Sequence, residues 1–196
     1  VNVSLASSSS QTVLGPTNRN TLTLKGTIEN AIGTPWADKI RGNSAANRIE
    51  GRAGNDTIYG GSGNDWLYGG EGSDSLYGES GNDAVLGGEG DDRLEASTGR
   101  NLLIGGLGTD NLKGSYGEEI LIGGTTLYDG NDAALAAIMA EWTSTRSFRQ
   151  RTDRLDAGIT YGTSQSARLR QRDPWPPRCQ HRATRRQHAS HEPNGT

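Results

Sequence analysis

The chain has 196 residues, a formal net charge of −3 at pH 7, and a hydrophobic share of 31% with one Phe, one Met and one Cys. That apolar share is well below the globular norm, so a conventional thick core is excluded, and a single cysteine excludes an internal disulfide framework. No apolar run reaches the roughly 18 residues of a membrane-spanning helix. The chain begins at Val1 without a charged and apolar leader, so we expect a piece of a longer protein.

The charge is divided unevenly along the chain. Residues 51–122 hold 13 acidic and 4 basic side chains, whereas residues 143–196 hold 4 acidic and 11 basic ones. Glycine is also concentrated, because 23 of the 29 glycines lie between Gly33 and Gly124. Such asymmetry indicates separate segments with different roles or origins.

Residues 1–32 are predicted to be rich in β-strand. The stretches VNVSLAS (1–7) and TLTLKGTIENAI (21–32) alternate apolar and polar residues, which is typical of half-buried strands. We expect this segment to lead into the next one as strands and to cap its N-terminal end.

Residues 33–122 are an internal repeat of nine residues, in ten units without a break in phase. The first position is Gly in every unit except the one beginning at Ala96. The eighth position is always aliphatic: Ile40, Ile49, Ile58, Leu67, Leu76, Val85, Leu94, Leu103, Leu112 and Leu121. The sixth is acidic or an amide: Asp38, Asn47, Asp56, Asp65, Asp74, Asp83, Asp92, Asn101, Asp110 and Glu119.

One unit predicts a turn followed by a short strand. Residues 60–65 are turn formers, because glycine adopts positive φ and permits close approach of backbones. Trp66, Leu67 and Tyr68 suit a three-residue strand in which Leu67 points opposite to its neighbours. Leu67 and its equivalents should therefore face inward, with Trp66 and Tyr68 facing outward.

This pattern, GGxGxDxUx with U apolar, resembles the RTX or hemolysin-type calcium-binding nonapeptide repeat. The resemblance implies an all-β fold, a right-handed parallel β-roll (a β-solenoid) in which two units close one coil, and calcium as its cofactor. Ten units then give about five coils, or roughly 24 Å of stacked strands. Cytosolic calcium would leave such sites mostly empty, so the roll should fold only outside the cell.

If two units form a coil, each unit stacks on the second unit along the chain, and the sixth positions divide into two rows. The odd row is all carboxylate, with Asp38, Asp56, Asp74, Asp92 and Asp110. The even row is poorer, with Asn47, Asp65, Asp83, Asn101 and Glu119. The predicted ligands are the carboxylates of Asp56, Asp65, Asp74, Asp83, Asp92 and Asp110, with backbone carbonyls around Gly54, Gly61, Gly63, Gly70, Gly72, Gly81, Gly88, Gly90, Gly106 and Gly108.

About four ions are expected, three in the odd row and one between Asp65 and Asp83 in the even row. The units beginning at Gly33 and Gly42 carry Trp36 and Ala45 where glycine belongs, so full sites are not expected there. The unit beginning at Ala96 also departs from the motif.

Residues 123–160 are predicted to form a helical C-terminal cap. Asp132 is a good N-cap, and Leu135, Ile138, Met139 and Trp142 follow helix spacing on one face. A second helix is expected over residues 147–157. The first helix should either close the open end of the roll or cover an outward apolar face, formed by Leu86, Leu102, Ile104, Ile120 and Ile122.

Residues 161–196 form a basic tail rich in Pro, Arg and His, which we expect to be disordered or an out-of-frame translation. Cys179, His181, His188 and His191 match no standard zinc spacing. The arginines come with no nucleic-acid-binding motif, so no nucleic-acid partner is predicted.

The sequence contains no catalytic constellation, so no enzymatic activity is expected of this chain. The leading hypothesis is a calcium-binding module of a larger secreted bacterial protein that stabilises attached domains. The alternatives are the C-terminal part of a secreted protease, lipase or epimerase, and a surface adhesin. A sugar-binding strip formed by Tyr59, Trp66, Tyr68 and Tyr77 is conceivable, but exposed strand residues or a docking face for the helix explain these aromatics better.

Overall fold

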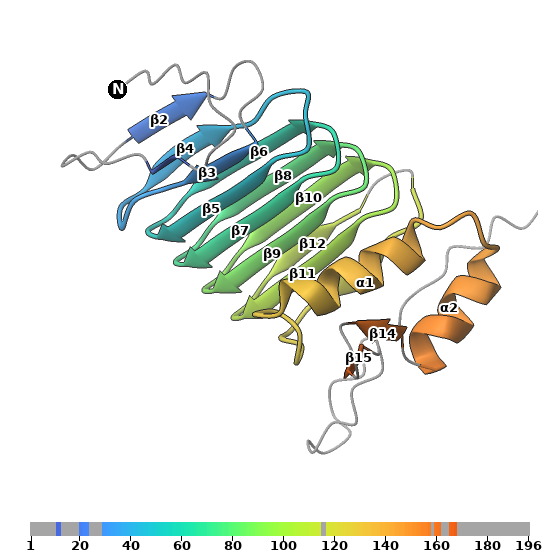
Figure 1. Ribbon diagram of the computed structural model, residues 1–196. Helices are drawn as coiled ribbons and strands as arrows, with labels where there is room; N and C mark the ends of the chain where they lie inside the picture. The colour runs from blue at the N-terminus through green and yellow to red at the C-terminus, as the bar shows by residue number, and fades with distance from the viewer. Residues whose placement is uncertain are drawn as a thin grey trace, which may run out of the picture.

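The computed structural model describes residues 11–12, 20–23, 29–114, 117–157, 159–161 and 165–167. The strand predicted over residues 1–7, most of the basic tail, and Cys179 with its neighbouring histidines lie outside the described residues. The described part is a parallel β-solenoid of about five coils followed by two helices (Figure 1).

Consecutive strands along the chain alternate between two parallel sheets, so each coil contributes one strand to each sheet. The strands are β1 (Gln11–Thr12), β2 (Asn20–Thr23), β3 (Asn30–Ile32), β4 (Asp38–Arg41), β5 (Arg48–Ala53), β6 (Thr57–Ser62), β7 (Trp66–Glu71), β8 (Ser75–Ser80), β9 (Ala84–Glu89), β10 (Arg93–Thr98), β11 (Leu102–Leu107), β12 (Asn111–Lys113) and β13 (Ile120–Ile122). Sheet I contains the odd-numbered strands and sheet II the even-numbered ones. Leu67 pairs with Val85, 18 residues away, so each unit stacks on the second unit along the chain, as predicted.

The strands from β5 to β11 are six residues long rather than the predicted three. β7, for example, runs from Trp66 through Gly69 and Gly70 to Glu71, and Gly70 pairs with Gly88 of β9. The first three positions of the next unit therefore extend the ladder. Glycine has low strand propensity, so local sequence gives no sign of this extension, which depends on register with the neighbouring coils.

The interior of the roll is filled mainly by the eighth-position side chains, which both sheets contribute. Ile49, Ile58, Leu67, Leu76 and Leu94 are completely buried. At the last coil Leu121 pairs with the interior residue Leu103 and so lies on the expected face, but its side chain is 48% exposed. Within the described residues no further coil covers Leu121, and the burial of each such side chain depends on a neighbouring coil.

Helix α1 (Asp132–Trp142) lies across the outer face of sheet I (Figure 1). Its apolar residues form a second core with Leu86, Leu102 and Ile104 of that face. Of the two predicted positions for this helix, covering the apolar face is the correct one. Asn131, and not Asp132, is the N-cap, because its side chain accepts a hydrogen bond from the Ala134 amide.

Helix α2 (Phe148–Ala157) packs beside α1 and is followed by a short antiparallel pair, β14 (Ile159–Tyr161) and β15 (Gln165–Ala167). Leu155 is fully buried, whereas Phe148 is 53% exposed and meets the Trp142 ring edge-on at 5.8 Å between centroids. In the described part of the chain, neither helix is long and apolar enough to cross a membrane.

Candidate metal centre

The sixth-position side chains connect consecutive turns of each row. In the odd row, Oδ1 of Asp74 accepts from the amide of Asp56 at 2.7 Å, and the amide of Asp74 donates to Oδ1 of Asp92 at 2.8 Å. In the even row, Oδ1 of Asp83 accepts from the amide of Asp65 at 2.9 Å. One carboxylate oxygen per turn thus holds the ladder together and leaves the other oxygen for a different role.

That second oxygen is buried without a hydrogen-bond donor. This holds for Oδ2 of all six predicted ligands: Asp56, Asp65, Asp74, Asp83, Asp92 and Asp110. A buried carboxylate oxygen without a partner is costly, and a cation is the usual compensation. Of these six oxygens, four belong to the odd row and two to the even row, and Oδ1 of Asp38 in the odd row is also buried without a donor.

The orphaned oxygens lie beside backbone carbonyls in a space kept open by glycine. A Cβ added at Gly51 would lie 2.2 Å from Oδ2 of Asp56 and 2.6 Å from the carbonyl oxygen of Gly69. At Gly69 the same construction meets Oδ2 of Asp74 at 2.2 Å and the Gly87 oxygen at 2.5 Å. Hard oxygen donors from two successive turns converge in this space, and such donors are the ones that calcium prefers.

In the units beginning at Gly51, Gly60, Gly69, Gly78, Gly87 and Gly105, the second and fourth positions adopt positive φ. All ten glycines predicted to surround the ligands adopt it, with φ of +116° at Gly70 and +119° at Gly72. Arg52 and Glu79 occupy second positions without being glycine and still adopt φ of +85° and +65°. Because such values are unfavourable for residues with a Cβ, the stacked turns impose this conformation on them.

We expect Gly70→Ala to destabilise the roll by about 1–3 kcal/mol, because it combines positive φ with a Cβ placed 1.9 Å from the Arg52 carbonyl oxygen. Gly124→Ala is the matched control, since nothing lies within 4 Å of a Cβ there. Urea denaturation in saturating calcium measures both. Equal midpoints for the two variants would contradict the close packing of the turns.

Burial raises the pKa of the stacked carboxyl groups. It raises the pKa of Asp74 to about 8, with further contributions from repulsion by Asp56 and Asp92. Burial is also the main reason why the pKa values of Asp56 and Asp83 rise to about 7. The pKa values of Asp65 and Asp92 rise to about 6 for the same reason. Without a cation, the rows hold their negative charge poorly at neutral pH.

The first turn of the odd row differs from those that follow. The amide and hydroxyl of Thr34 donate to Oδ2 of Asp38 at 2.6 and 2.9 Å, so this oxygen already has partners within its own turn. In the even row, the amide of Asn43 donates to Oδ1 of Asn47 at 2.9 Å. Oδ1 of Asp38 is nevertheless buried without a donor, and the expectation that the units beginning at Gly33 and Gly42 lack full sites stays a prediction.

The sequence analysis missed a second ladder at the fifth position. The Ser73 amide donates to Oδ1 of Asn55 at 3.0 Å, and the Asn82 amide donates to Oδ1 of Asn64 at 2.9 Å. Asp91 accepts from the Thr109 amide at 2.8 Å in the same way. The recurrence of Asn at this position was the available signal. These bonds run from the later turn back to the earlier one, whereas in the sixth-position ladder the earlier turn donates to the later one.

Among the described residues, no three side chains of His, Cys, Asp or Glu form a metal-binding cluster. Each turn places only one carboxylate, that of the sixth position, in its row, so any cation there must take most of its ligands from backbone carbonyls.

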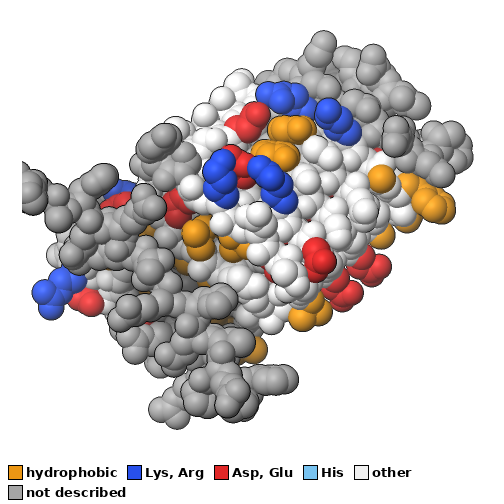
Figure 2. All heavy atoms as spheres, turned by 180° about the vertical axis from the view of Figure 1, so that it is seen from behind, with side chains coloured by type: hydrophobic (Ala, Val, Ile, Leu, Met, Phe, Trp, Pro, Cys, Tyr) orange, Lys and Arg blue, Asp and Glu red, His pale blue; other side chains and the backbone are white. Residues whose placement is uncertain are grey.

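The four aromatic residues considered as a sugar-binding strip belong to different faces. Tyr59 and Tyr77 lie on sheet II and stack on each other at 4.8 Å between centroids, so their ring faces point along the sheet. Trp66 and Tyr68 lie on sheet I and pack against the second core. Figure 2 shows the molecule from behind, with small hydrophobic groups beside basic side chains and no continuous apolar surface. The four residues therefore do not form one strip.

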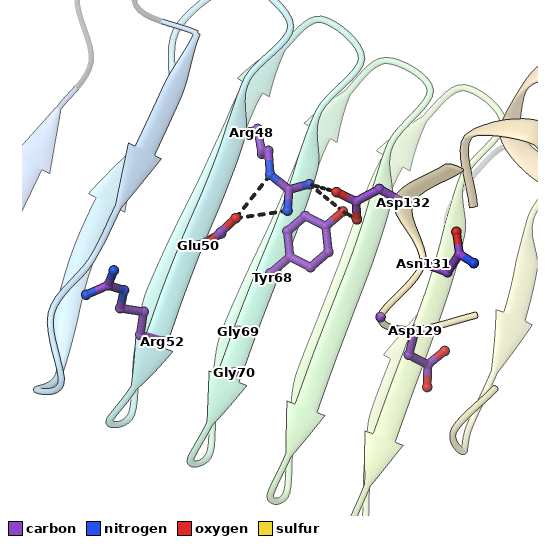
Figure 3. Close-up of a pocket in the computed structure, with 10 residues that line it drawn as sticks. Arg48, Glu50, Arg52, Tyr68, Gly69, Gly70, Asp129, Asn131 and Asp132 are labelled. Carbon is purple, nitrogen blue, oxygen red and sulfur yellow. Dashed lines mark hydrogen bonds and ion pairs between the residues drawn. The ribbon is translucent and has the colours of Figure 1, made fainter. Parts of the chain in front are cut away.

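A cavity of about 590 Å³ lies between sheet I and the start of α1 (Figure 3). Several of its polar groups bind one another: Arg48 pairs with Asp132 at 3.1 Å and with Glu50 at 2.9 Å, and the Tyr68 hydroxyl donates to Asp132 at 2.9 Å. These bonds anchor the N-terminus of α1 to β5 and β7.

Comparison with protein families agrees with the geometry of the turns. A sequence model of the RTX calcium-binding nonapeptide repeat matches the chain in four overlapping copies, at residues 32–67, 59–94, 86–117 and 95–125. No protein with curated function matches the chain. The matched residues include both rows of turns.

Proposed function

Because residues 32–125 belong to the RTX calcium-binding nonapeptide-repeat family and form a calcium-binding β-roll module, we propose that this module serves a larger secreted bacterial protein. It folds on calcium outside the cell and stabilises the domains attached to it. The repeat is a structural calcium-binding fold, so its contribution is conformational rather than catalytic.

The observation that supports this proposal is the set of buried, unpartnered Oδ2 atoms next to stacked glycine carbonyls. When bound, calcium supplies the positive charge that these oxygens lack. Two like charges about 5 Å apart repel by roughly 3 kcal/mol at an effective dielectric of 20. The interior contributes little stabilisation, because most nine-residue units bury only one aliphatic side chain in the roll. The metal's binding free energy therefore becomes folding free energy.

The distribution of orphaned oxygens favours unequal rows. In the odd row, Asp56, Asp74, Asp92 and Asp110 enclose three gaps between turns, each suited to one ion. In the even row, the gap between Asp65 and Asp83 is suited to one more. Thr34 already satisfies the corresponding oxygen of Asp38. On this basis we propose about four ions for the module, the number predicted from the sequence.

Calcium titration followed by far-UV circular dichroism tests the proposal. We expect a transition from coil to β-structure at about 0.1–1 mM calcium, the usual range of extracellular modules. Magnesium is the control, because it demands near-ideal octahedral geometry and dehydrates reluctantly. A chain whose spectrum in chelator already equals that in calcium would contradict the proposal, as would an equal response to magnesium.

A further inference from the structure

The molecule contains two apolar cores of different kinds. The interior of the roll holds ten buried aliphatic side chains, contributed by both sheets between Ala31 and Leu103. The second core is concentrated at the C-terminal end, between sheet I and the helices. Its buried members are Ala84, Leu86, Leu102, Ile104, Ala134, Leu135, Ile138, Met139, Trp142 and Leu155. The C-terminal end of the roll is thus stabilised by buried apolar surface, as an ordinary domain is, and its stability does not depend on the turns alone.

A group of charged side chains, which we call the arginine clamp, joins the helices to the last even-row turn. It consists of Arg100, Glu118 and Arg151. Nε of Arg100 lies 2.9 Å from the Glu118 carboxylate, which Arg151 of α2 also contacts. Arg100 donates to the Ser144 carbonyl at 2.8 Å, and the Trp142 indole donates to the Glu118 carbonyl at 3.2 Å.

The arginine clamp lies at a unit whose sequence departs from the calcium-binding motif. The unit beginning at Ala96 lacks glycine at its first two positions and carries Asn101 in place of an acid. Its Arg100 is bonded to Glu118, 18 residues further along the chain, and therefore links two successive turns of the even row. Arg100 and Glu118 both occupy fifth positions, so their ion pair links the two turns beside the sixth-position row and not within it. Arg151 adds a second positive charge, and its side chain is only 2% exposed.

We propose that the arginine clamp and the second core hold the C-terminal end of the molecule together without calcium. This inference rests on the proposed function, because it divides the chain into a part that needs the metal and a part that does not. In calcium-free solution β9, β11, β13, α1 and α2 stay associated. The turns that contain Asp56, Asp65 and Asp74 lose their structure under the same conditions.

Hydrogen exchange of the full chain, in chelator and in saturating calcium, tests this division. In chelator we expect amides of residues 132–155 and 102–107 to remain protected, while those of residues 57–80 exchange roughly tenfold faster or more than in calcium. Uniform loss of protection in chelator overturns the inference. If residues 57–80 stay unprotected even in calcium, the proposed function itself fails, whatever happens at residues 132–155.

Arg151→Met tests the clamp, because methionine keeps an unbranched side chain at the buried position but removes the charge. We expect α1 to lose protection in chelator, with exchange roughly tenfold faster or more, and to keep it in calcium. Arg93→Met is the matched control, since Arg93 is exposed on sheet II and pairs with Glu95. This variant should leave the exchange of the α1 amides unchanged both in chelator and in calcium.

Glu118→Gln is a second variant, which retains the size of the side chain and removes its charge. It is needed if the α1 amides of Arg151→Met are unprotected from exchange in calcium as well as in chelator. In Glu118→Gln, too, the α1 amides should lose their protection from exchange in chelator and keep it in calcium. If Glu118→Gln leaves α1 protected in chelator, or leaves it unprotected in both conditions, the clamp does not have the proposed role.

Discussion

Replacing Asp74 by alanine should raise the calcium concentration at the folding midpoint by roughly tenfold or more, the largest effect expected of any single substitution in the turns. Asp74 lies at the centre of the odd row. Its Oδ1 accepts from the Asp56 amide, its own amide donates to Asp92, and its Oδ2 is buried without a donor. Under the proposed distribution of ions, its loss affects two neighbouring ions as well as the ladder.

Two further variants separate the metal from the ladder. Asp74→Asn retains an oxygen for the Asp56 amide and removes only the charge and the second carboxylate oxygen, so most of the midpoint shift should remain. Asn101→Ala removes a ladder acceptor, since Asn101 Oδ1 accepts from the Asp83 amide at 2.8 Å, but no proposed calcium ligand. Calcium titrations of the three variants, followed by circular dichroism, distinguish the loss of a calcium ligand from the loss of a ladder acceptor. Equal shifts in Asp74→Ala and Asn101→Ala would show that the ladder, and not the metal, dominates.

The asymmetry between the rows explains why these variants should differ. Oδ1 makes the same bond whether the sixth residue is Asp74, Asp83 or Asn101, so the ladder itself does not require an acid. What the acid adds is a second oxygen and a negative charge at a buried position, both of which are unfavourable without a cation. The preference for aspartate at the sixth position is therefore explained by the metal rather than by the fold alone.

The repeat allowed much of this arrangement to be predicted from the sequence. A period of nine with an aliphatic eighth position determines which side chains face inward, and Leu67 and Leu76 are completely buried as expected. The division into two rows follows from two units per coil, and the pairing of Leu67 with Val85 agrees with it. The prediction succeeded because each unit contains its own local pattern and contacts the same partners two units away.

Features that depend on distant contacts could not be predicted. Nothing local to Arg100 or Arg151 distinguishes a clamp from solvent-exposed arginines, since Glu118 joins them only in the folded chain. The glycine-rich halves of the strands resemble loops until register pairs them with the next coil. The exposure of Leu121 likewise follows from what lies beside the last coil rather than from its own unit.

Stability should depend on pH with opposite sign in the absence and presence of calcium. In the metal-free roll, burial raises the pKa of Asp74 to about 8 and those of Asp56 and Asp83 to about 7, against an ordinary value of 3.8. The folded metal-free state then binds more protons than the unfolded chain between about pH 4 and 8. This contribution to the free energy of unfolding is fully present below about pH 4 and is lost as pH rises toward 8.

Calcium reverses the trend, because it binds the deprotonated carboxylates and releases their protons. Lowering the pH from 8 to 5.5 should therefore weaken calcium binding by roughly tenfold or more, while the β-content of the chelated chain increases over the same range. Circular dichroism in chelator and in a calcium series at each pH measures both trends. The Asp74→Asn variant should show a smaller pH dependence in each condition, since it lacks the carboxyl group with the highest pKa. If the midpoint in calcium did not change between pH 5.5 and 8, these buried carboxylates could not be the groups that bind the metal.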